Sequence, residues 1–265
     1  MAAVGDARGA RPVSPASTLA VLERALTVYR RVWRGSVFSG FLFPVMFLVA
    51  FGIGVGGRVG QVGGVDYLAW IVPGVLAATA FQTAVGECAF PVFGDFRWTR
   101  AYHAMRATPV RVGDMVAGWL LYIVVRVEIA TAAFLLVSAL FGALRSPWAP
   151  LTPLVCALVA LAAAAPMMGV AARVEHDGWF ALVFRFVVIP STLFGGVFFP
   201  VERLPAVVRP LAWLSPLWHG AELNRAATLG GVPPWPVAAH LGVLVAFAAA
   251  GAVLAWRCFS RRLED

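Results

Sequence analysis

Few side chains in this sequence have the types and spacing that chemistry requires. His219 and Glu222 stand three residues apart, so both could reach one metal ion from a helix, but no third ligand is apparent nearby. The cysteines Cys88, Cys156 and Cys258 lie in or beside apolar segments and form no CxxC or Cys/His pattern. We therefore expect neither a metal site nor a disulfide framework.

Nucleotide hydrolysis is not expected within this chain. A Walker A loop needs a lysine to hold the nucleotide phosphates, and all 21 basic residues here are arginine. A membrane hydrolase would need a base–nucleophile pair or an HExxH helix, and neither pattern occurs. The sequence predicts no enzyme activity, no catalytic residue and no cofactor of its own.

The composition indicates an integral membrane protein. Of the 265 residues, 61% are hydrophobic and 13% are charged, and the mean hydropathy is +0.83. The uncharged run between Arg34 and Arg58 would form a helix of about 35 Å, enough to cross a hydrocarbon core of roughly 30 Å. The net charge of +8 does not indicate nucleic-acid binding, because the arginines punctuate apolar segments rather than forming one basic domain.

Six segments are long and apolar enough to span a membrane: residues 36–57, 67–94, 114–141, 151–172, 179–199 and 236–256. The terminal segments and every second connection together carry 14 arginines, and the remaining connections carry 5. Because positive residues are enriched on the cytoplasmic side, we expect both termini in the cytoplasm and the chain in the inner (plasma) membrane. The expected organisation is a cytosolic tail with an amphipathic helix (1–35), a permease domain (36–256) and a cytosolic tail (257–265).

An amphipathic helix is expected over residues 18–34, just before the first span. One half of its helical wheel is mainly apolar, and the other half carries most of the charge. Its cationic face and its place beside a span predict a helix that lies in the cytoplasmic interface, although an ordinary juxtamembrane helix is the alternative. The residues assigned to this interfacial helix are Glu23, Arg30, Arg31, Trp33 and Arg34.

The stretch AYHAMRATPVR, residues 101–111, predicts a second amphipathic helix along the membrane. Its apolar face is formed by Trp98, Ala101, Tyr102 and Met105. The Thr108-Pro109 pair ends the helix, because the residue before a proline is pushed out of the α region. A solvated loop that only obeys the positive-inside rule is the alternative. Cationic groups on the flanks would face the cytosol, namely Arg97, Arg100, His103 and Arg106.

Three charges, Glu87, Arg126 and Glu128, lie inside the expected spans. Arg126 is roughly 18 Å into its helix, and Glu87 is roughly 12 Å from the inner end of its span. Intramembrane charges usually pair, so we expect Arg126 to contact Glu87 or Glu128. Such a pair could be structural or lie at a dimer interface, and it could also contact substrate or carry protons.

The outer segment 200–235 is too apolar for a free loop, yet Pro205, Pro210 and Pro216 interrupt any full crossing. Two short helices folded back into the outer leaflet fit this pattern better than a seventh span.

Taken together, these pieces resemble the permease subunit of ABC exporters of the type 2 permease family, near the drug-exporter and nodulation-factor-exporter branches. The matching pieces are the helix at 18–34, AYHAMRATPVRVGD at 101–114, and FGGVFFPVERLPAVVRPLAWLSPLWHGAELNR at 194–225. The resemblance covers nearly the whole chain. It implies an all-α membrane fold of six spans, with the interfacial helix, a cytosolic coupling helix and an outer re-entrant helical hairpin.

The resemblance also implies partners. A separate cytosolic ABC ATPase subunit, which binds ATP and Mg, would dock on the coupling helix, with Tyr102 and Met105 in a groove and Arg100 and Arg106 at its acidic rim. One departure is that Arg100 and His103 stand where acidic residues are often found before the Thr-Pro element. The coupling residues would be Arg97, Trp98, Arg100, Tyr102, His103, Met105, Arg106, Thr108 and Pro109, and the hairpin residues Phe198, Phe199, Pro200, Pro205, Pro216, Glu222 and Arg225.

We therefore expect a permease subunit that exports an amphipathic or lipid-linked substrate, such as a drug, glycolipid or oligosaccharide. Two copies in membrane lipid would form the pathway, and a second, different permease chain is an alternative to the homodimer. The competing hypothesis is a self-contained secondary transporter or channel. Inverted repeats with broken helices would favour that hypothesis, and we find no internal repeat.

Overall fold

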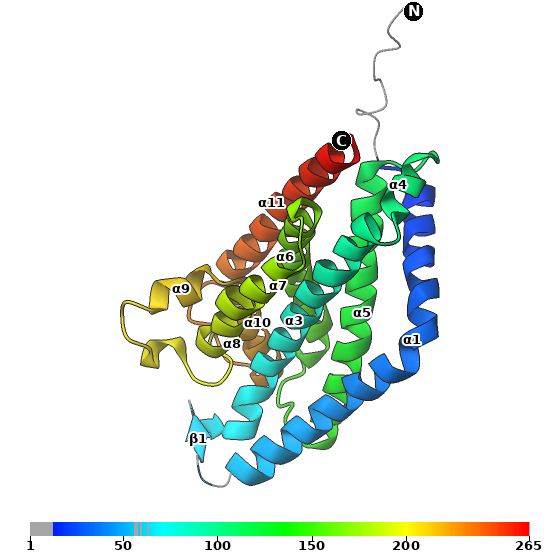
Figure 1. The fold of residues 1–265 in the computed structure, drawn as a ribbon. Helices are drawn as coiled ribbons and strands as arrows, with labels where there is room; N and C mark the ends of the chain where they lie inside the picture. The colour runs from blue at the N-terminus through cyan, green and yellow to red at the C-terminus, as the bar shows by residue number, and fades with distance from the viewer. Residues whose placement is uncertain (1–12, 56–57, 59, 63, 265) are drawn as a thin grey trace, which may run out of the picture.

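The computed structural model describes residues 13–55, 58, 60–62 and 64–264, and it shows a bundle of long helices (Figure 1). The all-α prediction agrees with it, apart from one pair of two-residue antiparallel strands. In chain order the elements are α1 (Pro15–Val49), the π-helix η1 (Ala50–Val55), β1 (Gln61–Val62), β2 (Val65–Asp66), α3 (Tyr67–Arg97), α4 (Ala101–Arg106), α5 (Val112–Leu140), the 3₁₀ turn η2 (Ala149–Leu151), α6 (Thr152–Arg173), α7 (Gly178–Val183), the π-helix η3 (Phe184–Val188), α8 (Ile189–Phe194), the 3₁₀ turn η4 (Val201–Arg203), α9 (Arg209–Leu214), α10 (Pro216–Leu229) and α11 (Val237–Glu264).

Four helical segments among the described residues are long and apolar enough to cross a membrane: Tyr67–Arg97, Val112–Leu140, Ala149–Arg173 and Val237–Glu264. They correspond to the second, third, fourth and sixth predicted spans. The fifth predicted span corresponds to the shorter apolar segment Gly178–Phe194. The first falls on α1 and η1, and its end at 56–57 lies outside the described residues. The chain is a multi-pass membrane protein, and the count of six stays a prediction.

Small residues allow α6 and α11 to pack closely. A Cβ on Gly251 would lie 2.4 Å from Cδ of Pro166, and one on Gly169 would lie 2.8 Å from Cγ of Leu254. Side chains larger than hydrogen would force these backbones apart. Close approach through glycine is the usual way in which membrane helices pack, because lipid supplies no hydrophobic drive between them.

The N-terminal helix differs from the prediction. A boundary between an interfacial helix and the first span was expected at residue 35, but α1 runs unbroken from Pro15 to Val49 and bends about half-way along (Figure 1). Its first half lies beside α5 and runs in the same direction. Val21 of α1 faces Gly118 of α5, where an added Cβ would lie 2.7 Å from Cβ of Val21. This close contact gives the first half of α1 a partner in the bundle, whereas its position relative to the membrane interface stays a prediction.

The segment 200–235 contains the two predicted short helices, α9 and α10. The part around α9 projects from the bundle, whereas α10 packs against α3, α6 and α11 (Figure 1). Pro216 is the first residue of α10. A backbone N–H at that position would have no acceptor within the helix, so proline loses no hydrogen bond there. The close contact of α10 with α6 depends on Gly220, because an added Cβ would overlap Cγ2 of Val159. Folding of this segment back into the outer leaflet stays a prediction.

Candidate functional site

The connection between α3 and α5, which contains α4, lies at the end of the bundle where α1 begins and α11 ends (Figure 1). We call this the α4 end. Trp98 is 67% exposed there, and its ring meets the edge of Phe93 at a centroid distance of 5.7 Å. Met105 is half-buried. The other exposed residues predicted to couple to an ATPase are Arg97, Arg100, His103, Arg106, Thr108 and Pro109.

The predicted outward role of Tyr102 is wrong, because its side chain has no exposed surface. Its ring packs on Phe96 of α3 and Phe259 of α11, at centroid distances of 4.6 and 5.0 Å. The Tyr102 ring is thus packed inside its own chain and does not face a groove on another protein. Burial raises the pKa of the Tyr102 phenol well above its usual value. Its hydroxyl has no hydrogen-bond partner within the described residues, so Tyr102 serves as a packing group.

An ion pair that the sequence analysis missed fixes the start of this connection. Arg24 of α1 donates two hydrogen bonds to Asp95 near the end of α3, at 2.8 and 3.0 Å. The Thr99 hydroxyl donates to the same carboxylate at 2.9 Å. The sequence contains a hint of this pair. Asp95, in FGDFR, is an acidic residue at the end of a predicted span, and Arg24 lies on the charged half of the helix predicted at 18–34.

A second carboxylate fixes the other end of the connection. Asp114 is fully buried and accepts the backbone N–H of Ser14 at 2.7 Å and that of Arg111 at 3.0 Å. Its position in the first turn of α5 suits a negative charge, because the free N–H groups of a helix start point toward it. The connection is therefore held to the N-terminal part of α1 at both ends.

The C-terminal helix also contacts the connection. The Arg106 guanidinium of α4 donates to the carbonyl oxygen of Leu263 near the end of α11. Tyr102 and Phe259 make a second contact between the same two helices. A displacement of α4 would therefore act on α1, α5 and α11 together.

The predicted interfacial residues lie on the exposed side of α1. The buried side is formed by Val21, Ala25 and Tyr29, which recur every four residues. Within the described residues, this helix thus keeps its cationic surface exposed apart from the paired Arg24. The exposed set is Glu23, Arg30, Arg31, Trp33 and Arg34.

The structure brings Arg126 and Glu87 together, with Nη2 and Oε1 separated by 2.7 Å. The Tyr122 hydroxyl lies 3.5 Å from Glu87, and the ring of Tyr29 lies 4.3 Å from the Arg126 guanidinium carbon. This cluster joins α1, α3 and α5. Glu128 is not part of it, and its buried Oε1 has no hydrogen-bond partner within the described residues.

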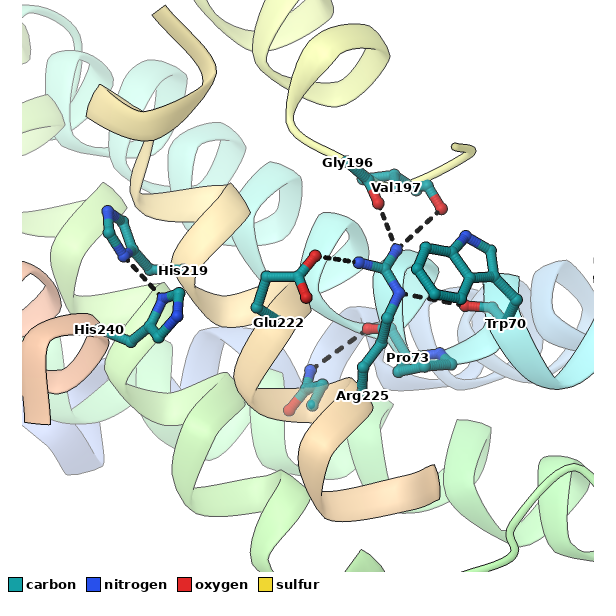
Figure 2. A network of polar contacts seen from close by, with 9 residues as sticks. Trp70, Pro73, Gly196, Val197, His219, Glu222, Arg225 and His240 are labelled. Atoms are coloured by element: carbon teal, nitrogen blue, oxygen red, sulfur yellow. Dashed lines mark hydrogen bonds and ion pairs between the residues drawn. The ribbon is translucent and has the colours of Figure 1, made fainter. Parts of the chain in front are cut away.

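A second buried charge cluster holds α10 in place (Figure 2). Arg225 is paired with Glu222 one turn earlier, and it donates to the carbonyl oxygens of Gly196 and Val197. The Trp70 ring lies 4.1 Å from its guanidinium carbon. The guanidinium thus joins α10 to α3 and to the turn after α8, which places two of the predicted hairpin residues in one structural cluster.

His219 does not share a ligand site with Glu222. Its Nδ1 lies 2.8 Å from Nδ1 of His240 on α11 (Figure 2), and its Nε2 lies 2.8 Å from the carbonyl oxygen of Trp213. If Nε2 of His219 donates to that carbonyl, Nδ1 of the same neutral ring must accept from His240. The two histidines therefore link α9, α10 and α11.

The remaining predicted hairpin residues are spread over the turn before α9. Phe198 lies 6.4 Å from Phe51 between ring centroids, and Phe199 packs on a small apolar cluster around Trp218. Pro200 precedes the turn η4, and Pro205 follows it. These residues shape the turn and do not converge on one polar site.

Comparisons with known proteins identify the family of the chain. Residues 16–229 match the family described as ABC-2 type transporter. Nodulation protein J of Rhizobium leguminosarum bv. trifolii is 31% identical over 261 residues, which cover 98% of each chain. Inner membrane transport permease YadH of Escherichia coli (strain K12) is 28% identical over 236 residues, 88% of this chain and 90% of the relative. The chain therefore belongs to the ABC-2 type transporter family.

Proposed function

We propose that this chain is the transmembrane permease subunit of an ATP-driven exporter, with the α4 end facing the cytosol. The observation that carries this proposal is the connection through α4, which exposes Trp98 and a set of cationic residues while both of its ends are fixed to α1. A separate cytosolic ABC ATPase subunit would bind this surface and would carry ATP and Mg. The chain itself supplies no lysine for a Walker A loop.

Force from the ATPase would enter the bundle through three routes. Arg24–Asp95 connects the start of the connection to α1, Asp114 connects its end to α1 and α5, and α4 itself contacts α11. Rigid helices joined by buried contacts can move as units when one end is displaced. The coupling surface therefore comprises Trp98, His103 and Arg106. Tyr102 contributes by packing α4 on α3 and α11.

The transported molecule would be amphipathic or lipid-linked, such as a drug, a glycolipid or an oligosaccharide. Two copies of the chain would line the pathway, each with six spans, both termini in the cytosol and the α9–α10 segment re-entering the outer leaflet. The relatives support transport of some kind, since one of them is named an inner membrane transport permease. Exposed apolar residues along the long helices suit contact with lipid and with a second copy.

The proposal is tested by purifying the chain alone and together with an ABC ATPase subunit from the same organism, each in lipid. We expect ATP hydrolysis and export only from the complex. Robust ATP hydrolysis by the isolated chain would refute the proposal that a separate subunit hydrolyses ATP. Transport driven by an ion gradient without any ATPase would instead support a self-contained secondary transporter. Reporters fused after Asp265 and near Gly231 should report cytosolic and external positions, respectively.

A further inference from the structure

A cavity of about 880 Å³ opens at the α4 end, between the ends of α3, α6 and α11 and the start of α4. Three of its lining residues are apolar and buried, namely Phe96, Ala172 and Cys258. A single carboxylate, that of Glu175, is among the residues that line it. The other lining residues are cationic or can become so, namely Arg97, Arg100, His103, Arg173, Arg261 and Arg262.

These arginines differ from the paired arginines elsewhere in the described part of the chain. The side chains of Arg97, Arg100, Arg173 and Arg261 form no ion pair or hydrogen bond with any described residue. Positive charges held close together repel one another, so a bound negative group would relieve repulsion in this cavity. Within the described residues, the protein does not supply enough negative charge to balance it.

Arg262 is already oriented toward the cavity by its own contacts. It donates to the carbonyl oxygens of Ala172 and Val174 at 2.8 and 2.9 Å, and its guanidinium carbon lies 5.1 Å from the centre of the Phe96 ring. These bonds use Nη1, so the other guanidinium nitrogens can still donate to a bound group. An arginine held this way loses little freedom when a ligand arrives.

The backbone at Arg100 adds a second, independent feature. Its φ of 51° is in the left-handed region, and among the described residues Arg100 is the single non-glycine residue with a positive φ. This conformation is unfavourable for a side chain with a Cβ, and such strain concentrates at binding sites. It sets the direction in which the chain enters α4, with Arg100 at the wall of the cavity.

The ligand chemistry follows from these groups. Guanidinium forks bind phosphate through paired hydrogen bonds, and several of them suit a phosphate better than a single carboxylate. The volume falls in the range of pockets that hold whole small molecules, so it exceeds what inorganic phosphate needs. The cavity also lies where three membrane-length helices end, and the ends of spanning helices are expected near the lipid headgroups. We propose that this cavity binds the phosphate-bearing headgroup of an anionic phospholipid.

Native mass spectrometry of the full chain in detergent, without any ATPase, tests this proposal and does not depend on the export function. Phosphatidylglycerol and phosphatidylcholine would be added at equal concentration. We expect one phosphatidylglycerol to be retained preferentially. The Arg173→Gln/Arg261→Gln double variant should bind it roughly 30-fold more weakly, since two headgroup contacts are lost.

The matched control is Arg203→Gln/Arg257→Gln, which removes two exposed arginines that do not line the cavity. This control should bind phosphatidylglycerol like the wild type, and circular dichroism should show both double variants folded. Equal loss in the control, or no loss in the cavity variant, would overturn the proposal. Displacement of the lipid by an equal concentration of soluble glycerol phosphate would assign the cavity to a free anion instead. Unchanged lipid binding with loss of ATPase co-purification in the cavity variant would assign it to an acidic protein segment.

Discussion

Arg24 and Asp95 join α1 to the end of α3 through two parallel hydrogen bonds, from Nη1 to Oδ2 at 2.8 Å and from Nη2 to Oδ1 at 3.0 Å. The same carboxylate accepts the Thr99 hydroxyl just before α4. A forked pair fixes orientation as well as distance, so it can transmit rotation between the helices that it joins. This pair therefore joins α1 directly to the start of the α4 connection.

Replacing Arg24 with Gln should uncouple ATP hydrolysis from transport more than it destabilises the protein. Because the pair is partly exposed, its loss should lower the free energy of unfolding by only about 1 kcal/mol. The measurement is transported substrate per ATP hydrolysed in proteoliposomes that contain the partner ATPase, beside a thermal melt. The exposed Arg31→Gln variant is the control. A reversed pair, Arg24→Asp/Asp95→Arg, should recover part of the coupling, and an unchanged transport ratio in Arg24→Gln would exclude this role.

Gly74→Ala should destabilise the protein by about 1–3 kcal/mol, because overpacking forces side chains and backbone to shift. An added Cβ would lie 2.8 Å from the carbonyl oxygen of Val197 and 3.1 Å from Nη2 of Arg225. Gly86→Ala on the same helix is the matched control, since nothing lies within 4 Å of its added Cβ. Thermal unfolding in detergent compares the two. Equal melting temperatures would mean that the turn at Val197 moves freely and that Arg225 does not fix it.

Replacing one member of the buried Glu222–Arg225 pair should destabilise the protein more than replacing both. Arg225→Met leaves the Glu222 carboxylate buried without its partner, and removal of one partner of a buried pair costs about 3–5 kcal/mol. Glu222→Met/Arg225→Met removes both charges and should recover part of that stability. Thermal unfolding of both variants in one detergent measures the difference. A double variant as unstable as the single one would locate the effect in the contacts of Arg225 with Gly196 and Val197.

The long apolar helices could be predicted from the sequence because length and hydropathy are properties of one segment. Four of the predicted spans coincide with helices of membrane length. The helix does not break at the boundary expected at residue 35, because α1 continues through it, so the division between an interfacial part and the first span stays a prediction. Charge and amphipathic pattern changed there, but helix continuity depends on backbone hydrogen bonds, which neither pattern reports.

The site was predicted less completely, because its contacts are tertiary. The connection 101–111 was recognised as a short helix ended by Thr108-Pro109, and α4 does end at Arg106. The helical wheel gave the apolar face of α4 but not its partner. Whether Tyr102 meets another protein or α11 of its own chain depends on where residue 259 lies, which no local pattern specifies. Asp95 and Asp114 were missed for the same reason.

The exposed Trp98 and the buried Tyr102 give a test of the proposed coupling surface. Trp98→Ala removes an exposed aromatic side chain at the α4 end, and such residues often dominate binding at interfaces. We expect ATPase affinity to fall about tenfold, with the melting temperature of the isolated chain little changed. Affinity is measured by titrating the detergent-purified chain with the ATPase.

Tyr102→Ala should mainly lower the thermal stability of the isolated chain, whereas Trp98→Ala should mainly lower its affinity for the ATPase. Deleting a fully buried ring leaves a cavity between α3, α4 and α11, and such deletions cost about 3–5 kcal/mol of stability. Tyr102→Phe keeps the ring and removes a hydroxyl that has no partner within the described residues, so its stability and ATPase binding should match the wild type. If Tyr102→Ala lost ATPase binding without loss of thermal stability, its side chain would have to leave the core in the complex. If Trp98→Ala bound normally, the coupling surface would have to lie elsewhere at the α4 end, with Arg106 and His103 as the next residues to replace.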